Sequence, residues 1–94
     1  MPKLEALVPR LVARFPPAAE METAVLYVSE EYGTATHLCA CGCGNEVVTP
    51  FDSPSGWDCT RDGDKVTLSP SIGNWSFPCR SHYFIRENQV AWIP

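Results

Sequence analysis

Apolar side chains near the N-terminus recur at a spacing typical of one face of a helix. They are Leu4, Leu7, Val8, Leu11 and Val12. This spacing predicts a short helix, but Pro9 within the run disfavours a regular one, so an extended segment is the alternative. Pro16 and Pro17 end whatever forms there. We therefore expect residues 1–20 to be an N-terminal segment that packs on the rest of the chain.

From Ala24 onward, the pattern changes to short runs of strand-forming residues separated by turns. The runs are residues 24–28, 34–38, 46–49, 57–60, 65–68, 83–85 and 90–92. Asp62 with Gly63, and Glu87 with Asn88, separate the last four runs and favour the tight turns of β-hairpins. We expect residues 21–94 to form a mostly β domain, either a small antiparallel β-sandwich or an arrangement of hairpins like that of a Rieske protein or a zinc ribbon.

The length and composition of the chain limit both its core and its partners. Ninety-four residues make one domain, whose modest core is only marginally stable from packing alone. A net charge of −4, with seven scattered basic residues, disfavours DNA or RNA as the main partner. No apolar stretch suits a signal sequence or a membrane span, so we expect a cytoplasmic protein without membrane attachment.

The cysteines are the residues with the most chemistry to offer. In a reducing compartment, five of them are expected to be thiols or metal ligands rather than disulfides. Cys39, Cys41 and Cys43 follow one predicted strand, and Cys79 and His82 precede another. Tetrahedral zinc takes four nitrogen or sulfur ligands. The sequence therefore predicts a structural Zn²⁺ site that clamps two loops together.

Five candidate ligands compete for the four positions around this ion. The favoured set is Cys41, Cys43, Cys79 and His82. Gly42 and Gly44 permit positive φ angles and place the first pair at the tip of a tight turn, which leaves Cys39 as the reserve ligand. The alternative without a metal is that these thiols are buried and act as small apolar side chains.

Iron is the main rival to zinc. A Rieske iron–sulfur cluster takes two cysteines and two histidines from two loops with similar spacings. The first loop here has cysteine where a Rieske loop needs histidine, so three cysteines and one histidine suit a single zinc ion better.

Other polar residues are expected to have structural roles. Cys59 lies outside both ligand loops and is interpreted as a strand thiol, and His37 as a packed strand histidine. Ser69 and Ser71 have no visible base partner, because His82 is better used as a metal ligand.

The combined motifs resemble a family of small bacterial proteins of unknown function. The matching runs are residues 25–29, 34–39, 41–44, 47–50, 68–75, 79–83 and Trp92. Members of that family look like zinc-binding proteins and are often encoded beside ubiquitin-like conjugation components: a multiubiquitin-type modifier, E1-like and E2-like enzymes and a JAB-type protease. The resemblance implies that Cys39, Cys41, Cys43, Cys79 and His82 are the metal ligands.

The resemblance also suggests a function. It implies a zinc-stabilised binding module, an adaptor or E3-like accessory protein of a bacterial ubiquitin-like pathway, with a modifier or an E2-like enzyme as its protein partner. One alternative is a thiol enzyme that carries a modifier as a thioester on the spare cluster cysteine, Cys39. Another is a Rieske-like electron-transfer protein.

Overall fold

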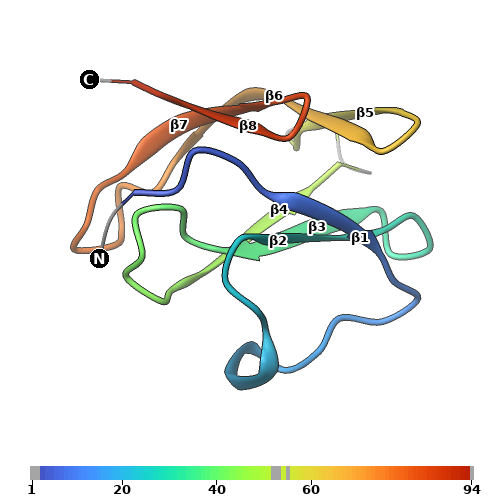
Figure 1. Ribbon diagram of the computed structural model, residues 1–94, viewed down its shortest axis with the longest axis horizontal. Coiled ribbons are helices and arrows are strands. Elements are labelled where there is room, and N and C mark those ends of the chain that lie inside the picture. Colours follow the sequence, from blue (N-terminus) through green and yellow to red (C-terminus); the bar gives the residue numbers. More distant parts are fainter. Residues whose placement is uncertain (1–2, 52–53, 55, 94) are drawn as a thin grey trace.

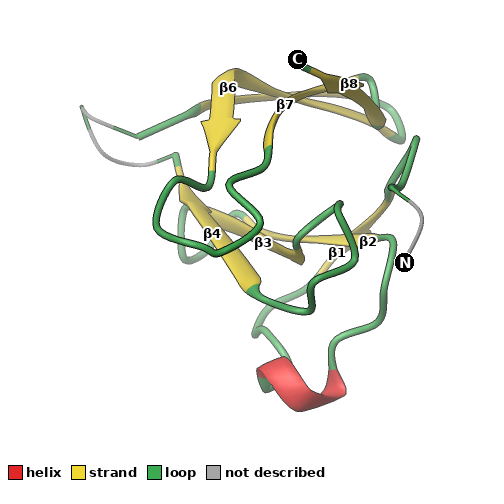
Figure 2. Ribbon diagram, turned by 90° about the vertical axis from the view of Figure 1, so that its left-hand side faces the viewer, coloured by secondary structure: helices red, strands yellow, loops and turns green. Residues whose placement is uncertain are grey.

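The computed structural model describes residues 3–51, 54 and 56–93. Its strands form two four-stranded sheets that lie face to face as two layers (Figures 1 and 2). The first sheet has the order β1 (Val8–Leu11), β2 (Val25–Ser29), β3 (Thr34–Leu38), β4 (Glu46–Pro50). The second has the order β5 (Asp58–Asp62), β6 (Lys65–Gly73), β7 (His82–Arg86), β8 (Gln89–Trp92). The expected mostly β fold is confirmed.

The N-terminal run with the helical spacing is extended. β1 pairs in parallel with β2, from Val8 opposite Val25 to Leu11 opposite Val28. Pro9 lies in this strand, and an edge strand tolerates a residue that lacks an N–H group. The 3-10 turn η1 (Ala18–Glu20) follows, and no helix in the described part of the chain is long and apolar enough to cross a bilayer.

The residues just before β1 connect the two sheets. The N–H of Val90 donates to the carbonyl of Glu5, and the N–H of Leu7 donates to the carbonyl of Asn88, each at 2.8 Å. The N-terminal residues therefore bond to the second sheet through β8 and then join the first sheet as β1, as the blue ribbon in Figure 1 shows.

The second sheet is built from hairpins at the expected turn residues. Gly63 has a φ of 63°, and Glu87 and Asn88 have φ values of 48° and 70°. Such positive φ angles match the twist that two-residue hairpin turns need. β6 and β7 pair antiparallel with an irregularity between Leu68 and Ile72, and the loop of residues 74–81 joins them.

Alternation along the strands places apolar side chains between the two sheets. The largest fully buried apolar side chains in this core include Leu26, Val28, Val66, Leu68, Ile72, Tyr83 and Ile85. A polar contact crosses the core between His37 in β3 and Tyr83 in β7, where Nε2 of His37 lies 2.8 Å from the tyrosine hydroxyl. His37 is thus a packed strand histidine, as its sequence context indicates.

The buried imidazole of His37 makes stability depend on pH. Burial lowers the pKa of His37 from 6.5 to about 4, since the charged ring would lose its hydration. Among the described residues, none hydrogen-bonds Nδ1 of this ring. The folded state therefore favours the neutral ring, and the unfolded state binds a proton first as the pH falls. The stabilisation is complete above pH 6.5 and is lost between pH 6.5 and about 4.

We expect the free energy of unfolding to fall by about 3 kcal/mol across this pH range because of His37, at 1.36 kcal/mol per pH unit. The measurement is urea unfolding at several pH values for the native protein and for His37→Gln, which keeps a hydrogen-bonding side chain near Tyr83 but does not titrate. A difference between the two proteins that does not change with pH would contradict the assignment.

Candidate metal centre and serine–histidine pair

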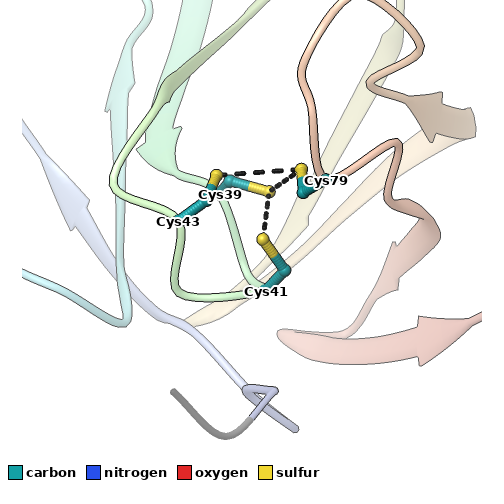
Figure 3. Close-up of side chains that lie close together, drawn as sticks. All are labelled: Cys39, Cys41, Cys43 and Cys79. Carbon is teal, nitrogen blue, oxygen red and sulfur yellow. Dashed lines mark hydrogen bonds between the residues drawn. The ribbon is translucent and has the colours of Figure 1, made fainter.

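Two loops from different sheets bring four cysteine side chains together at one end of the sandwich (Figure 3). One loop follows β3 and carries Cys39, Cys41 and Cys43, and the loop between β6 and β7 carries Cys79. The four sulfur atoms all lie within 4.8 Å of one another. No disulfide joins them, and all are free thiols.

The first loop has the tight turn that its glycines predict. Gly42 and Gly44 have φ values of 92° and 85°, which are strained for residues with a side chain. The N–H of Gly42 donates to the carbonyl of Cys39 at 3.0 Å, and the N–H of Cys39 donates to the carbonyl of Asn45 at 2.8 Å. The turn therefore folds back on itself and points its sulfur atoms toward Cys79.

The sulfur–sulfur distances match those of a tetrahedral metal site. Sγ of Cys39 lies 3.5 Å from Cys41 and 3.8 Å from Cys79, and Sγ of Cys43 lies 3.7 Å from Cys79. Four sulfurs around a zinc ion at 2.3 Å are roughly 3.8 Å apart, whereas a disulfide bond measures about 2 Å. The residues present therefore fit a metal ion with four thiolate ligands.

Polar side chains surround the sulfur atoms. Oγ of Ser81 lies 3.0 Å from Sγ of Cys39 and 3.5 Å from Sγ of Cys79. The amide of Asn74 donates to Ser81 at 2.9 Å, and that of Asn45 donates to Cys43 at 3.2 Å. Such second-layer hydrogen bonds orient metal ligands and offset the negative charge of thiolates.

Burial and hydrogen bonds shift the pKa values of Cys41 and Cys79 in opposite directions. Burial, reinforced by hydrogen bonds with Cys43 and Cys39, raises the pKa of Cys41 to about 12. Burial alone would also raise the pKa of Cys79, but hydrogen bonds with Ser81, Cys41 and Cys43 bring it down to about 6. Cys79 therefore ionises more readily than Cys41, and a bound cation would favour the thiolate form of its ligands.

Neither histidine of the chain belongs to this cluster. His37 is bonded to Tyr83, and Nε2 of His82 lies 2.8 Å from Oγ of Ser71. Ser71 is in β6 and His82 begins β7, so neighbouring strands of the second sheet hold the two side chains together. The structure therefore brings together the three cysteines of the first loop and Cys79, and it places the fifth candidate ligand beside a serine.

Sequence reasoning missed the Ser71–His82 pair because it assigned the imidazole to the metal. The signal that could have found it is the number of cysteines near the two loops. Four cysteines are enough for a tetrahedral site, so His82 is not needed as a ligand. Cys59, the remaining cysteine, is half-buried in β5 and lies outside the cluster, consistent with its interpretation as a strand thiol.

A tryptophan packs against the imidazole of His82. The ring of Trp75 packs edge-on against the imidazole, with centroids 4.9 Å apart, and the guanidinium of Arg80 lies 6.0 Å from the indole centroid. Gly73 makes room for this indole: a Cβ atom at Gly73 would lie 2.5 Å from Nε1 of Trp75, which is closer than any stable contact. The indole therefore lies against both Gly73 and His82, although Trp75 as a whole is 56% exposed.

A cavity of about 250 Å³ opens beside His82 and the cysteine cluster. Its lining includes the aromatic rings of Trp75 and Trp92 and the cationic side chains of Lys3 and Arg80, with no acidic residue among the described residues. The cavity therefore gives His82 an aromatic and positively charged neighbourhood, while Ser71 lies outside its lining.

The fold and the site define a small β-sandwich protein with a four-cysteine cluster that could hold a metal ion and a serine–histidine pair beside it. Residues 11–93 match the family described as bacterial ubiquitination-like system serine protease (BubE), and the chain belongs to this family. The resemblance to proteins of bacterial ubiquitin-like operons is thereby confirmed. Neither the curated proteins nor the solved structures include a match.

We expect the purified chain to bind one metal ion, and each of the substitutions Cys39→Ser, Cys41→Ser, Cys43→Ser and Cys79→Ser to lower the metal content and remove cooperative unfolding. Structural zinc contributes about 10–16 kcal/mol in finger peptides, as much as the whole stability of a typical domain. Elemental analysis and thermal unfolding measure both effects.

Cys59→Ser and His82→Ala are the matched controls for this series. Each should retain one metal ion per chain, because Cys59 lies outside the cluster and His82 is bonded to Ser71. Loss of the metal in His82→Ala would show that the histidine is a ligand after all, as the sequence pattern favours.

Proposed function

We propose that this protein is a serine protease of a bacterial ubiquitination-like system, with Ser71 as the nucleophile and His82 as its general base. The observation that carries this proposal is the distance of 2.8 Å between Oγ of Ser71 and Nε2 of His82. Nucleophile and base need such a hydrogen bond for proton transfer. The description of the family as a serine protease supports the same assignment.

The reaction follows from these two side chains. His82 Nε2 takes the proton of the Ser71 hydroxyl as Oγ attacks the carbonyl carbon of the scissile bond. The protonated imidazole then gives that proton to the departing amine, which leaves an acyl group esterified to Ser71. A water molecule, deprotonated by His82, attacks the ester, and its proton returns to Oγ as the carboxylic acid leaves.

Trp75 takes the orienting role that a carboxylate has in a Ser–His–Asp triad. Among the described residues, no carboxylate is within hydrogen-bonding distance of the His82 imidazole, whereas the Trp75 indole packs directly against it. A ring held by packing keeps Nε2 aimed at Ser71. The pair is therefore a dyad positioned by an aromatic side chain.

We assign zinc to the four cysteines, with a structural role. Four sulfur ligands fill a tetrahedral zinc site and leave no open position for a water molecule, as structural sites do. Cys79 stands three residues before His82, and the loop of residues 74–81 runs from β6 to β7 through the cluster. The ion would thus hold the loop that carries the base and contacts the indole.

The proposed substrate is a protein of the same pathway, a ubiquitin-like modifier or a conjugate of one. The alternative is the adaptor or E3-like role that the family resemblance implies. That role does not explain the hydrogen-bonded Ser71–His82 pair. The thioester alternative is disfavoured, because Cys39 is only 2% exposed and belongs to the metal cluster.

We expect a fluorophosphonate probe to label Ser71 in the metal-loaded protein, because only a serine activated by a base reacts readily with this electrophile. Ser71→Ala should abolish labelling, and His82→Ala should slow it about a hundredfold or more, the contribution typical of a general base. Intact-mass and peptide mass spectrometry measure the extent and the site of labelling.

Ser69→Ala is the matched control, because Ser69 is an exposed serine of the same strand. It should label at the native rate. An adaptor would show no labelling at Ser71 and would keep its partner binding in Ser71→Ala, and that result would reject the protease assignment.

Gly73→Ala should slow labelling of Ser71 about tenfold without loss of the metal, because the added methyl group displaces Trp75 from His82. The control is a double-mutant cycle with Trp75→Ala, since coupled residues depart from additivity. In the Trp75→Ala background, Gly73→Ala should have no further effect. Equal effects of Gly73→Ala in both backgrounds would contradict a role through the indole.

A further inference from the structure

β5 covers only the first half of its neighbour β6. The β5–β6 pairing runs from Asp62 opposite Lys65 to Asp58 opposite Ser69, and β6 continues to Gly73. Ile72 and Gly73 pair with β7 on one side, and no described strand pairs with residues 70–73 on the other. This last part of β6 is therefore a free sheet edge within the described structure.

The backbone groups that face this free edge belong to Ser71 and Gly73. The N–H of Asn74 donates to the carbonyl of Ser81 at 2.8 Å, so Asn74 bonds toward the strand that follows, and Ile72, opposite Tyr83, does the same by alternation. Gly73 lies between them, so its N–H and C=O groups point the other way. Ser71 is in phase with Gly73, because its side chain bonds that of His82, the residue opposite Gly73. Gly73 is exposed and Ser71 is half-buried, so the edge is accessible next to the nucleophile.

We propose that this edge, Ser71 to Gly73, binds an extended segment of the polypeptide substrate as an added β-strand. The inference rests on the proposed protease function and names how its substrate is held. A free edge supplies main-chain hydrogen bonds to any unfolded peptide, which is the basis of recognition by β-strand addition. The substrate class is therefore a flexible, extended chain segment, such as the tail of a folded modifier.

The orientation of the added strand follows from β5. Antiparallel pairing is the more stable arrangement, and β5 itself runs antiparallel to β6. A substrate strand that extends β5 at its N-terminal end would run in the same direction as β5. Its scissile carbonyl would then lie opposite Ser71, and the residues before the scissile bond would lie opposite Gly73. The N–H of Ser71 then points at the carbonyl oxygen whose carbon Oγ attacks, so one residue binds and reacts with the same group. The residues after the bond must leave the sheet, because β5 begins at Asp58.

Peptidyl diphenyl phosphonates test this arrangement on the full-length, metal-loaded protein. These probes esterify a reactive serine through phosphorus with loss of phenol, and they carry residues only on the acyl side of the bond. We expect acetyl-tetra-alanine-type probes to inactivate Ser71 at least tenfold faster than the single-residue probe. N-methylation of the residue opposite Gly73 should cancel the gain, and N-methylation of an adjacent residue should not, because bonds to a strand edge alternate.

Amide hydrogen exchange gives the second measurement. In the free protein, the N–H groups of Ser71 and Gly73 should exchange much faster than that of Ile72, and trapping by the tetrapeptide probe should slow them at least tenfold. Inactivation that is indifferent to peptide length and to N-methylation, with Ser71 still labelled by the small fluorophosphonate, would overturn strand addition alone. Absence of labelling by both kinds of probe would reject the protease function, and the strand-addition inference with it.

Discussion

The convergence of four thiol groups is the constraint on which the rest of the site depends. Cys79 is tied to the three cysteines of the other sheet, and only Arg80 and Ser81 separate it from His82. Ser81 bonds the sulfur atoms and accepts from Asn74 at the opposite end of the same loop. The loop is therefore fixed at both ends by one cluster. A sandwich of 94 residues has too small a core to hold such a loop by packing.

Side chains on β6 and β7 alternate between the core face and the opposite face, which carries Ser71 and His82. Ile72 and Tyr83 point inward and are fully buried, while the residues beside them, Ser71 and His82, are half-buried on the other face. The inward pair is locked by the bond from Tyr83 to His37 across the core. Because a strand cannot tilt one side chain without moving the next, the core also fixes the direction of the dyad.

The sequence predicted the parts of the structure that short-range patterns encode. The strands, the hairpin turns at Gly63 and Asn88 and the tight turn at Gly42 all have local signals, and all are present. The apolar spacing of the N-terminal run predicted a helix as one of two alternatives, but the run forms an edge strand. Its conformation is set by pairing with β2, which the local spacing does not encode. Pairing of Ser71 with His82 depends on the register across an irregular stretch of β6, which no local pattern reports.

The assignment of His82 shows why ligand spacing alone is a weak guide to a metal site. A histidine three residues after a cysteine is compatible with two assignments. It can be a second ligand in the same zinc loop, or a general base at the start of the strand that follows a metal-bound loop. Four sulfurs near tetrahedral spacing favour the second assignment, because four thiolate ligands fill a tetrahedral site without an imidazole. In this arrangement a bound ion would hold the chain on one side of His82, while Trp75 packs against the imidazole on the other. The proposed dyad, which has no carboxylate partner among the described residues, needs that rigidity to keep the imidazole directed at Ser71.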